Sequence, residues 1–453
     1  MMEAMRLDAD YAAHAKVDWL ESLLRRRDFV PLDSVLQSIG SGHTPYQHDV
    51  SQGEIGFVTV ECIDALQLNE ESLKRITQEQ YNSEFKGKRL TDGSVVCTIK
   101  RRICKAYPFL EAPNPPLAFN QDVALLVPND EVKPAYLAAY LSCSVGQRFA
   151  DRQKTEQMNP YISVENLRTL PVCIFSDTFQ DAITEVFRKA EATKAECITL
   201  YQKAGSRLLY ELGLLDWQPP EPLTYECRAS EAFATGRLDS EYFSPKYESL
   251  EAFLNQRFTV ERIAQWGKVL KGNSVKYTDD SQGVPVIRSG DLTDIEDNQK
   301  FLRALPDQEM FLLKPNDILI SSIGFGSIGK VQVFDKQGKY ATVSEVTIIR
   351  QKRVNSYFLH FYLRSLAGQI QINRYITGAT GQLHLYPKDV GAILVPLVSQ
   401  ELERKLEELF KHARRLKAEA KRLLEKAKRG VEIAIEESEA AAMTFLEAGS
   451  LKE

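Results

Sequence analysis

The feature that most constrains this chain is an internal repeat. RLDADY, beginning at Arg6, returns as RLDSEY, beginning at Arg237, 231 residues later. Three further pairs recur in the same order: SQGEIGFVTVECI with SQGVPVIRSGDL, PAYLAAYLSCSVGQ with SYFLHFYLRSLAGQ, and KAECITLYQKA with KAEAKRLLEKA. Because several matches in register indicate duplication, we expect two copies of one unit: an RLDxxY element, a globular part and a long helix.

Each copy ends in a stretch whose apolar residues follow alternating steps of four and three, as in a coiled coil. In chain order the two seams are Phe179, Ile183, Val186, Ala190, Thr193, Cys197, Leu200 and Ala204, and Leu402, Leu406, Leu409, Ala413, Leu416, Ala420, Leu423 and Ala427. Gly213 and Gly430 lie where the patterns fade and are expected to end the helices. At 1.5 Å per residue, helices of about 28–34 residues make a rod of about 40–50 Å. The small residues repeated in both seams favour pairing of the two helices, and since each helix follows its own globular part, an antiparallel pair would hold those parts at opposite ends of a rod. The alternative is that each helix lies on the core of its own domain.

The predicted fold class is α+β, with two similar mixed α/β domains separated by two long antiparallel coiled-coil helices and an internal pseudo-two-fold repeat. Short β-like runs such as VVCTI, DVALLV, DILISSI, VQVF and EVTII alternate with turns, and AYLAAYL and YFLHFYL read as helices. The predicted boundaries are 1–28 for the first RLDxxY element, 29–175 for the first globular domain, 176–214 for the first long helix, 215–257 for the linker with the second RLDxxY element, 258–398 for the second globular domain and 399–447 for the second long helix.

Composition narrows the class of protein. The length of 453 residues predicts two or three domains, and no apolar run approaches a membrane span. The seven cysteines are scattered without a C-x-x-C pair, and the N-terminus does not read as a secretory signal, so we expect reduced thiols in the cytoplasm. The net charge of −5 does not exclude nucleic acid, because local potential governs phosphate binding.

Three motifs resemble catalytic or metal sites but lack parts of them. The run Gly324 to Val331 fits G-x-G-x-x-G, but it lies between two predicted strands and has valine where a Walker loop needs Ser or Thr. Asn114-Pro115-Pro116-Leu117 resembles an adenine methyltransferase motif without its stacking aromatic residue. His43 and His48 have no third metal ligand at a useful spacing. We therefore expect a non-catalytic chain that binds no metal.

Both globular parts carry concentrated positive charge among strand ends and turns. In the first it lies at Lys86, Lys88, Arg89, Lys100, Arg101, Arg102 and Lys105, and in the second at Lys268, Lys271, Lys276, Arg288, Lys330, Arg350, Lys352 and Arg353. Such residues neutralise phosphates, and neighbouring loops can read base edges. The alternative is that each cluster is a solvated basic face without a ligand. Because the clusters recur in both halves, DNA binding is favoured.

With these residues collected, the chain resembles the specificity subunit of a type I restriction–modification system. The resemblance is carried by SGHTP (41–45), LLKPNDILISSIGFGSIGKV (312–331), the GQ pair after each YL helix, TGATGQLHL (377–385) and the two KAE helices. The sequence departs from the family where the first domain has CTIKRRICK, which shows no clear counterpart of IGK, and where PLVSQELE precedes the second helix.

The resemblance implies two target recognition domains, each binding one half of a bipartite double-stranded DNA target. Methyltransferase subunits and restriction/translocase subunits would supply the chemistry, with S-adenosylmethionine, ATP and Mg expected on those partners and none in this chain. The residues predicted to contact DNA are Thr44, Lys100, Arg101, Arg102, Arg288, Lys330, Gln382 and His384. The residues predicted to bind partners, on the helices, are Lys194, Glu196, Lys417 and Glu419.

Three other functions fit parts of the sequence. The chain would be a DNA adenine methyltransferase in its own right if Asn114 were catalytic. It would be a coiled-coil scaffold if its paired domains gripped proteins. It would also fit the specificity subunit of another phage-defence methylation system.

Overall fold

The computed structural model describes residues 14–47, 52–155, 158–293, 301–307, 310–324, 326–378 and 383–448. The first repeat phrase, which begins at Arg6, lies outside these residues. The chain divides into two compact units, unit 1 (Met1–Lys194 with Glu419–Glu453) and unit 2 (Ala195–Ala418). Among the described helices, none has the length and apolar character needed to cross a membrane.

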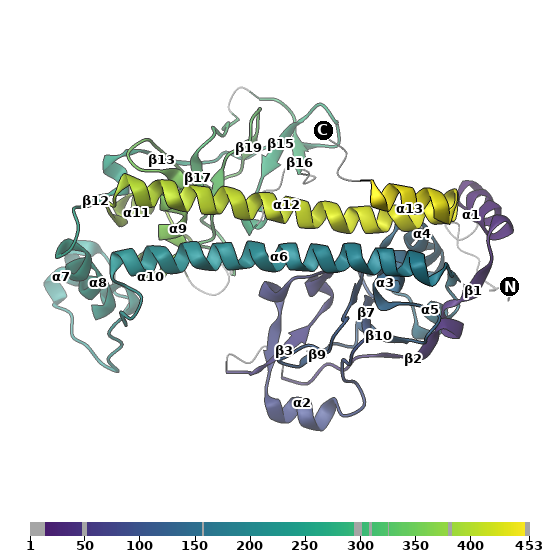
Figure 1. Ribbon diagram of the computed structural model, residues 1–453. Coiled ribbons are helices and arrows are strands. Elements are labelled where there is room, and N and C mark those ends of the chain that lie inside the picture. Colours follow the sequence, from purple (N-terminus) through teal and green to yellow (C-terminus); the bar gives the residue numbers. More distant parts are fainter. Residues whose placement is uncertain are drawn as a thin grey trace. The chain divides into compact units, whose positions relative to one another are not determined.

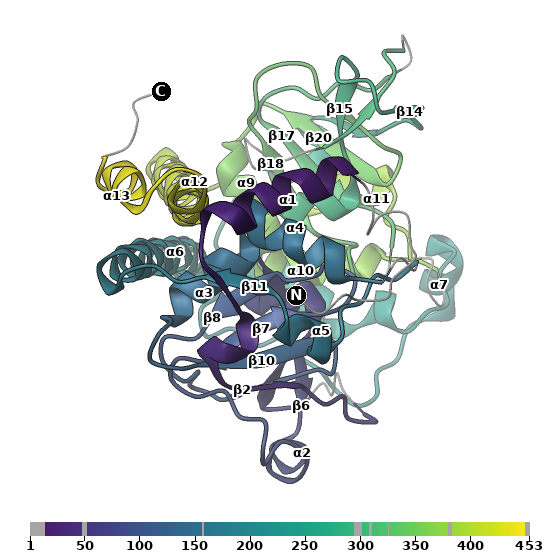
Figure 2. The same ribbon diagram turned by 90° about the vertical axis from the view of Figure 1, so that its right-hand side faces the viewer.

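Unit 1 is built on a four-stranded antiparallel sheet (Figures 1 and 2). Across this sheet the strands are β2 (Leu36–Ser41), β10 (Val123–Pro128), β7 (Val95–Thr98) and β8 (Ala106–Pro108). A second sheet has β6 (Lys74–Ile76), β3 (Ile55–Val58) and β9 (Leu117–Phe119), and two short pairs join β1 (Phe29–Pro31) to β11 (Pro171–Cys173) and β4 (Ile63–Asp64) to β5 (Gln67–Leu68). β3 and β7 are buried throughout, as their continuous apolar runs predict.

The helices of unit 1 pack on both of its larger sheets. They are α1 (His14–Arg26), α2 (Gln78–Glu84), α3 (Pro134–Ser142), α4 (Ser144–Gln153) and α5 (Val164–Arg168). α3 packs on β7 and β8 and α5 on β2, whereas α2 packs on the second sheet. α3 is buried on every side, and the Tyr140 hydroxyl donates a 2.5 Å hydrogen bond to the Pro171 carbonyl. α1 runs beside α4, with the Arg148 guanidinium 4.1 Å from the centre of the Trp19 ring (Figure 2).

Unit 2 repeats the strand order of the main sheet and the short pair of β1 with β11. Its main sheet is β13 (Gly267–Lys271), β20 (Val346–Gln351), β17 (Asp317–Ser321) and β18 (Val331–Phe334). The second sheet is β14 (Tyr277–Thr278), β16 (Leu302–Ala304), β15 (Val284–Ile287) and β19 (Ala341–Thr342), and β12 (Val260–Arg262) pairs with β21 (Leu394–Pro396). As in unit 1, the second sheet contains one parallel pair, β3 with β9 in the first copy and β15 with β19 in the second.

The helices of unit 2 follow the same plan. They are α7 (Ala229–Thr235), α8 (Pro245–Asn255), α9 (Ser356–Arg364), α10 (Leu366–Tyr375) and α11 (Pro387–Ala392). The Tyr362 hydroxyl donates to the Leu394 carbonyl at 2.8 Å, which is the bond that Tyr140 makes in unit 1. The predicted α+β fold class with an internal repeat is confirmed, and so is the alignment of Tyr140 with Tyr362.

The long helices α6 (Asp177–Leu212) and α12 (Gln400–Glu436) pair antiparallel within each unit (Figure 1). In unit 1, Phe179 and Ile183 near the start of α6 share a core with Val431 near the end of α12. In unit 2, Leu212 at the end of α6 shares a core with Leu402 at the start of α12. The predicted pairing is confirmed, and each helix half also packs on its own domain, so the alternative arrangement is present alongside it.

The prediction for the two helix ends is half right. Gly213 follows α6 directly with a φ of 68°, a left-handed conformation that glycine adopts at low cost. Gly430 lies inside α12, so its assignment as a helix end was wrong. A Cβ at Gly430 would lie 2.8 Å from Cδ2 of Leu446, which belongs to the following helix α13 (Glu439–Glu447). This glycine permits close helix packing instead of termination.

Candidate nucleic-acid interface

The basic cluster of unit 1 lies on the turn that joins β7 to β8. The Thr98 N–H donates to the Lys105 carbonyl at 2.9 Å, and the Cys104 N–H donates to the Thr98 carbonyl at 2.7 Å. Outside the turn, the Ile162 N–H donates to the Ile99 carbonyl at 2.9 Å. Arg101 and Cys104 have positive φ values of 61° and 52°, which are uncommon for residues with a side chain. The surrounding bonds therefore hold this turn in one conformation.

The turn that joins β17 to β18 in unit 2 is built by the same bonds. The Ser321 N–H donates to the Lys330 carbonyl at 2.9 Å, and the Gly329 N–H donates to the Ser321 carbonyl at 2.9 Å. The Leu385 N–H donates to the Ser322 carbonyl at 2.9 Å. Gly324 and Gly329 have φ values of 111° and 80° at the positions of Arg101 and Cys104. The glycines serve a turn between strands, as the sequence predicted.

These bonds make Lys105 and Lys330 equivalent residues. ICK (103–105) therefore occupies the place of IGK (328–330), although sequence comparison found no clear counterpart for it. The physical reason is that the second turn is two residues longer before this point, so a residue-by-residue alignment loses register. Lys105 belonged to the predicted basic cluster but was not among the predicted DNA contacts. Its signal in the sequence was an Ile-x-Lys that runs directly into a buried strand.

The three cations predicted on the first turn are all engaged by carboxylates. The Lys100 ammonium lies 3.4 Å from Asp122, Arg101 Nη1 lies 2.6 Å from Glu61, and Arg102 Nη2 lies 2.7 Å from Asp64. The two arginine side chains are 57% and 42% exposed. Exposed pairs of this kind contribute about 0–1 kcal/mol, so these guanidinium groups can exchange a carboxylate for a phosphate at low cost.

The electrostatics of this turn favour negative charge. Partial burial opposes ionisation of Glu61, but hydrogen bonds from its own backbone and from Thr59, with the Arg101 guanidinium, lower its pKa below the usual value. Partial burial also lowers the pKa of Lys105, and although Asp64 opposes the shift, Lys428 and Arg102 lower it further. A further anion beside Lys105, in addition to Asp64, would relieve the repulsion among Lys105, Arg102 and Lys428.

Thr44 lies in the loop after β2, close to the same turn. Its Oγ1 accepts a 3.3 Å hydrogen bond from the Gln121 N–H, and Lys100 pairs with the next residue, Asp122. The structure thus brings Thr44 and Lys100 to one loop, residues 120–122. His43, set aside as a metal ligand, binds Glu84 at 2.6 Å, and His48 lies outside the described residues.

In unit 2, His384 lies against the longer turn. It forms isolated β-bridges with Ile323 and Thr377, and its ring stacks on Tyr386 with centroids 6.0 Å apart. Arg288 stands directly before the 3₁₀ helix Ser289–Thr293, which packs on β17 and β18, and it pairs with Asp291. Gln382 lies outside the described residues. Lys330 therefore lies on this turn and His384 lies against it, while Arg288 approaches the same strands from another element.

The helix residues predicted to bind partners differ in their surroundings. The Lys194 ammonium donates to the Leu68 carbonyl at 2.8 Å, so its charge is directed to its own unit. Glu419 pairs with Arg422 at 2.8 Å, Glu196 is exposed and Lys417 is half-buried. Of these residues, Glu196 presents the most open side chain.

A comparison with known protein families identifies unit 2. Residues 256–426 match the family model described as the type I restriction modification DNA specificity domain. This segment, about two fifths of the chain, is therefore similar to the DNA specificity domain of type I restriction–modification systems. The match covers the strands of unit 2 from β12 to β21 and most of α12, and unit 1 has a main sheet of the same strand order. The resemblance inferred from the repeat is confirmed.

Solved structures of similar proteins match the chain over nearly its whole length. A chain described as a type I restriction-modification system S subunit from M. genitalium has 14% identity and a TM-score of 0.39, over 94% of this chain and 96% of that chain. One described as the HsdS subunit from Thermoanaerobacter tengcongensis has 14% identity and a TM-score of 0.29, over 93% and 96%. Among curated proteins, the comparison finds no match. The similarity to the family therefore rests on the match of residues 256–426.

Proposed function

We propose that this chain is the DNA sequence-specificity subunit of a type I restriction–modification complex. Its two globular domains, 29–175 and 258–398, would each bind one half of a bipartite double-stranded DNA target. The observation that carries the proposal is that both copies present a lysine at the same point of the same hydrogen-bonded turn, Lys105 and Lys330. Two equivalent cationic readers in one chain suit a split target.

The long helices would set the spacing between the two halves of the target. α6 has 36 residues and α12 has 37, so each is about 55 Å long at 1.5 Å per residue. One turn of DNA measures about 34–36 Å. Helices of this length are sufficient to hold two readers on one side of a duplex at a constant separation.

Chemistry would come from partner subunits. Methyltransferase subunits with S-adenosylmethionine would dock along the helices, through surfaces that include Glu196, Lys417 and Glu419, and restriction/translocase subunits would bring ATP and Mg. In this chain the methyltransferase-like Asn114 lies exposed in the loop between β8 and β9. The chain itself would act as a non-catalytic reader in the cytoplasm.

The proposal is tested by mapping methylated adenines in the host genome with and without the gene. We expect a bipartite motif with a constant spacer to vanish when the gene is deleted. Changing Arg101 and Arg102 to alanine should relax or weaken recognition of one half of that motif only, because both residues lie in unit 1. The matched control is Arg25→Ala with Arg26→Ala, an adjacent exposed arginine pair on α1. A motif unaffected by deletion, or an equal loss at both halves, contradicts the proposal.

A further inference from the structure

Two glutamines hold the twin turns from the same position. Each directly follows a glycine in the first turn of a helix: Gln147 on α4, which follows α3, and Gln369 on α10, which follows α9. The Gln147 Nε2 donates to the Cys104 carbonyl at 2.8 Å and to the Leu141 carbonyl at 2.7 Å. The Gln369 Nε2 donates to the Gly329 carbonyl at 3.2 Å and to the Leu363 carbonyl at 2.7 Å. Both copies therefore use one side-chain amide to join a turn to a helix.

The two acceptors of each glutamine explain what this amide does. Leu141 and Leu363 lie in the last turns of α3 and α9, where carbonyls lack an intrahelical partner. The other carbonyl belongs to the positive-φ residue immediately before the turn's lysine. Because a side-chain amide has two N–H donors, one glutamine fixes the turn to the end of a buried helix.

The lysines that follow these anchors differ from the other cations of the first turn. Lys100, Arg101 and Arg102 are each paired with a carboxylate. In the part of the chain that the structure describes, no ion pair is found for the ammonium of Lys105 or of Lys330. Asp64 and Asp151 influence Lys105 at longer range, together with the cations Arg102 and Lys428. A cation that is held in place but not neutralised suits an external anion.

We propose that Gln147 and Gln369 are positioning residues that hold Lys105 and Lys330 as two equivalent contacts to DNA backbone phosphates, one in each half of the target. The inference rests on the proposed function, since it assumes that both units face DNA. It adds that the contact is to phosphate, that the first unit uses Lys105, and that two glutamines set both contacts.

Salt dependence of DNA binding tests the contacts. The full chain is titrated onto a random-sequence duplex several turns long, and the dissociation constant is measured by fluorescence anisotropy between 50 and 200 mM salt. Each lost phosphate contact lowers the slope of log K against log salt by about 0.9. Lys105→Ala and Lys330→Ala should each reduce the change in affinity across this range by about threefold. The control Lys339→Ala, an exposed lysine beyond the other end of β18, should leave it unchanged.

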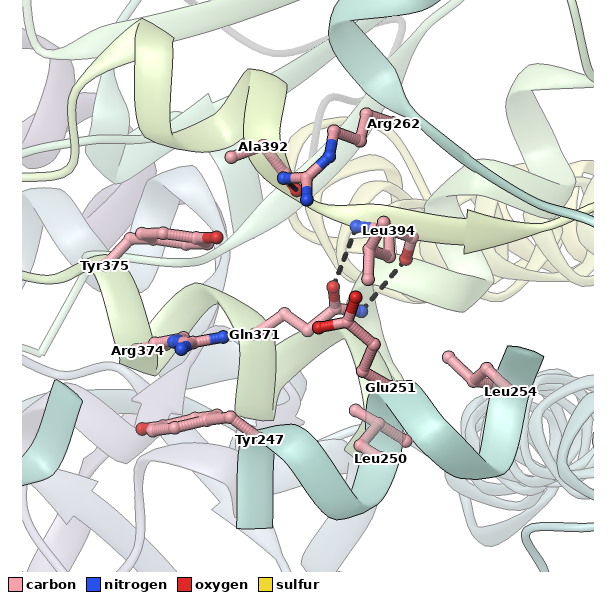
Figure 3. Close-up of a pocket in the computed structure, with 10 residues that line it drawn as sticks. All are labelled: Tyr247, Leu250, Glu251, Leu254, Arg262, Gln371, Arg374, Tyr375, Ala392 and Leu394. Atoms are coloured by element: carbon pink, nitrogen blue, oxygen red, sulfur yellow. Dashed lines mark hydrogen bonds between the residues drawn. The ribbon is translucent and has the colours of Figure 1, made fainter. Parts of the chain in front are cut away.

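A double-mutant cycle tests the positioning role. Gln369→Leu should lower the slope about as much as Lys330→Ala, and combining the two should cause no further loss, because residues that act as a unit are not additive. Gln371→Leu is the matched control, since Gln371 lies on the same helix but bonds to both backbone groups of Leu394 (Figure 3). Gln371→Leu should lower thermal stability without changing the slope.

The outcomes are distinguishable. Salt-dependent binding with unchanged slopes in Lys105→Ala and Lys330→Ala overturns the inference and leaves the proposed function standing. Additive losses in Gln369→Leu with Lys330→Ala, or the same slope loss in Gln371→Leu, show that the glutamines stabilise the fold without positioning the lysines. Absence of any salt-dependent binding by the unaltered chain overturns the proposed function together with this inference.

Discussion

A glycine on α10 allows a sharp test of the packing that supports the second turn. Gly368 lies in the first turn of α10, directly before Gln369, and a Cβ at Gly368 would lie 2.3 Å from the Tyr362 carbonyl oxygen and 2.4 Å from Leu363 Cα. Gly146 has the same place in unit 1, where a Cβ would lie 2.1 Å from the Tyr140 carbonyl oxygen. These neighbours are backbone atoms of a buried helix and cannot rotate away. Gly368→Ala should therefore destabilise unit 2.

The expected magnitude is a balance of two effects. Alanine is preferred over glycine inside a helix by about 1 kcal/mol. Overpacking a tight core costs about 1–3 kcal/mol, and a contact to backbone belongs at the upper end because α10 itself must shift. The net change is a loss of about 1–2 kcal/mol in the free energy of unfolding. Gly205→Ala in α6 is the matched control, since a Cβ there meets no atom within 4 Å and should gain about 0.5–1 kcal/mol.

Urea unfolding followed by tryptophan fluorescence measures both variants. Trp217 and Trp266 report on unit 2, and Trp19 lies in unit 1. We expect a lower midpoint for Gly368→Ala and a higher one for Gly205→Ala, with similar slopes against urea. A Gly368→Ala chain as stable as the unaltered chain would refute the close approach of α10 to α9.

Two further predictions concern charged groups. Asp317 is 2% exposed and accepts from Arg350 Nε at 2.8 Å and from the Lys314 N–H at 2.8 Å, so Asp317→Asn should lower the free energy of unfolding by about 2–3 kcal/mol in urea titrations. This is less than the cost of breaking a fully buried pair, because Arg350 is partly exposed; an unchanged midpoint would count against the pair. Partial burial opposes ionisation of Glu432, but hydrogen bonds from Ser144 and Arg429 lower its pKa below 4.5. Its stabilisation is therefore present above pH 4.5 and is lost as the pH falls through the lowered pKa, so Glu432→Gln should be less stable than the unaltered chain near neutral pH and the difference should shrink in acid. A difference that grows in acid would contradict the assignment.

Much of the architecture followed from sequence pattern. The duplication predicted two copies of one unit, and the heptad seams predicted that the two long helices pair, because both depend on residue spacing along one chain. The glycine run from Gly324 was correctly predicted as a turn, since strands flank it on both sides. Gly430 was misread because a glycine at a helix end and a glycine beneath a packed leucine look identical in sequence.

The candidate site was only partly predictable. Lys330 and the cluster around Arg101 stood out by charge, but Gln147 and Gln369 were noted only as a repeated pair, with no role. Their role depends on carbonyl groups that carry no sequence signal, in a turn about 40 residues away along the chain.

The sequence by itself determined that the chain contains one unit twice, joined by helices with apolar seams, because periodicity and repetition are properties of the order of residues. Only the tertiary structure decided that Lys105 and Lys330 are the same residue of that unit. The two turns differ in length, so their correspondence is defined by backbone hydrogen bonds and by a glutamine from a distant helix, and these exist only once the chain has folded.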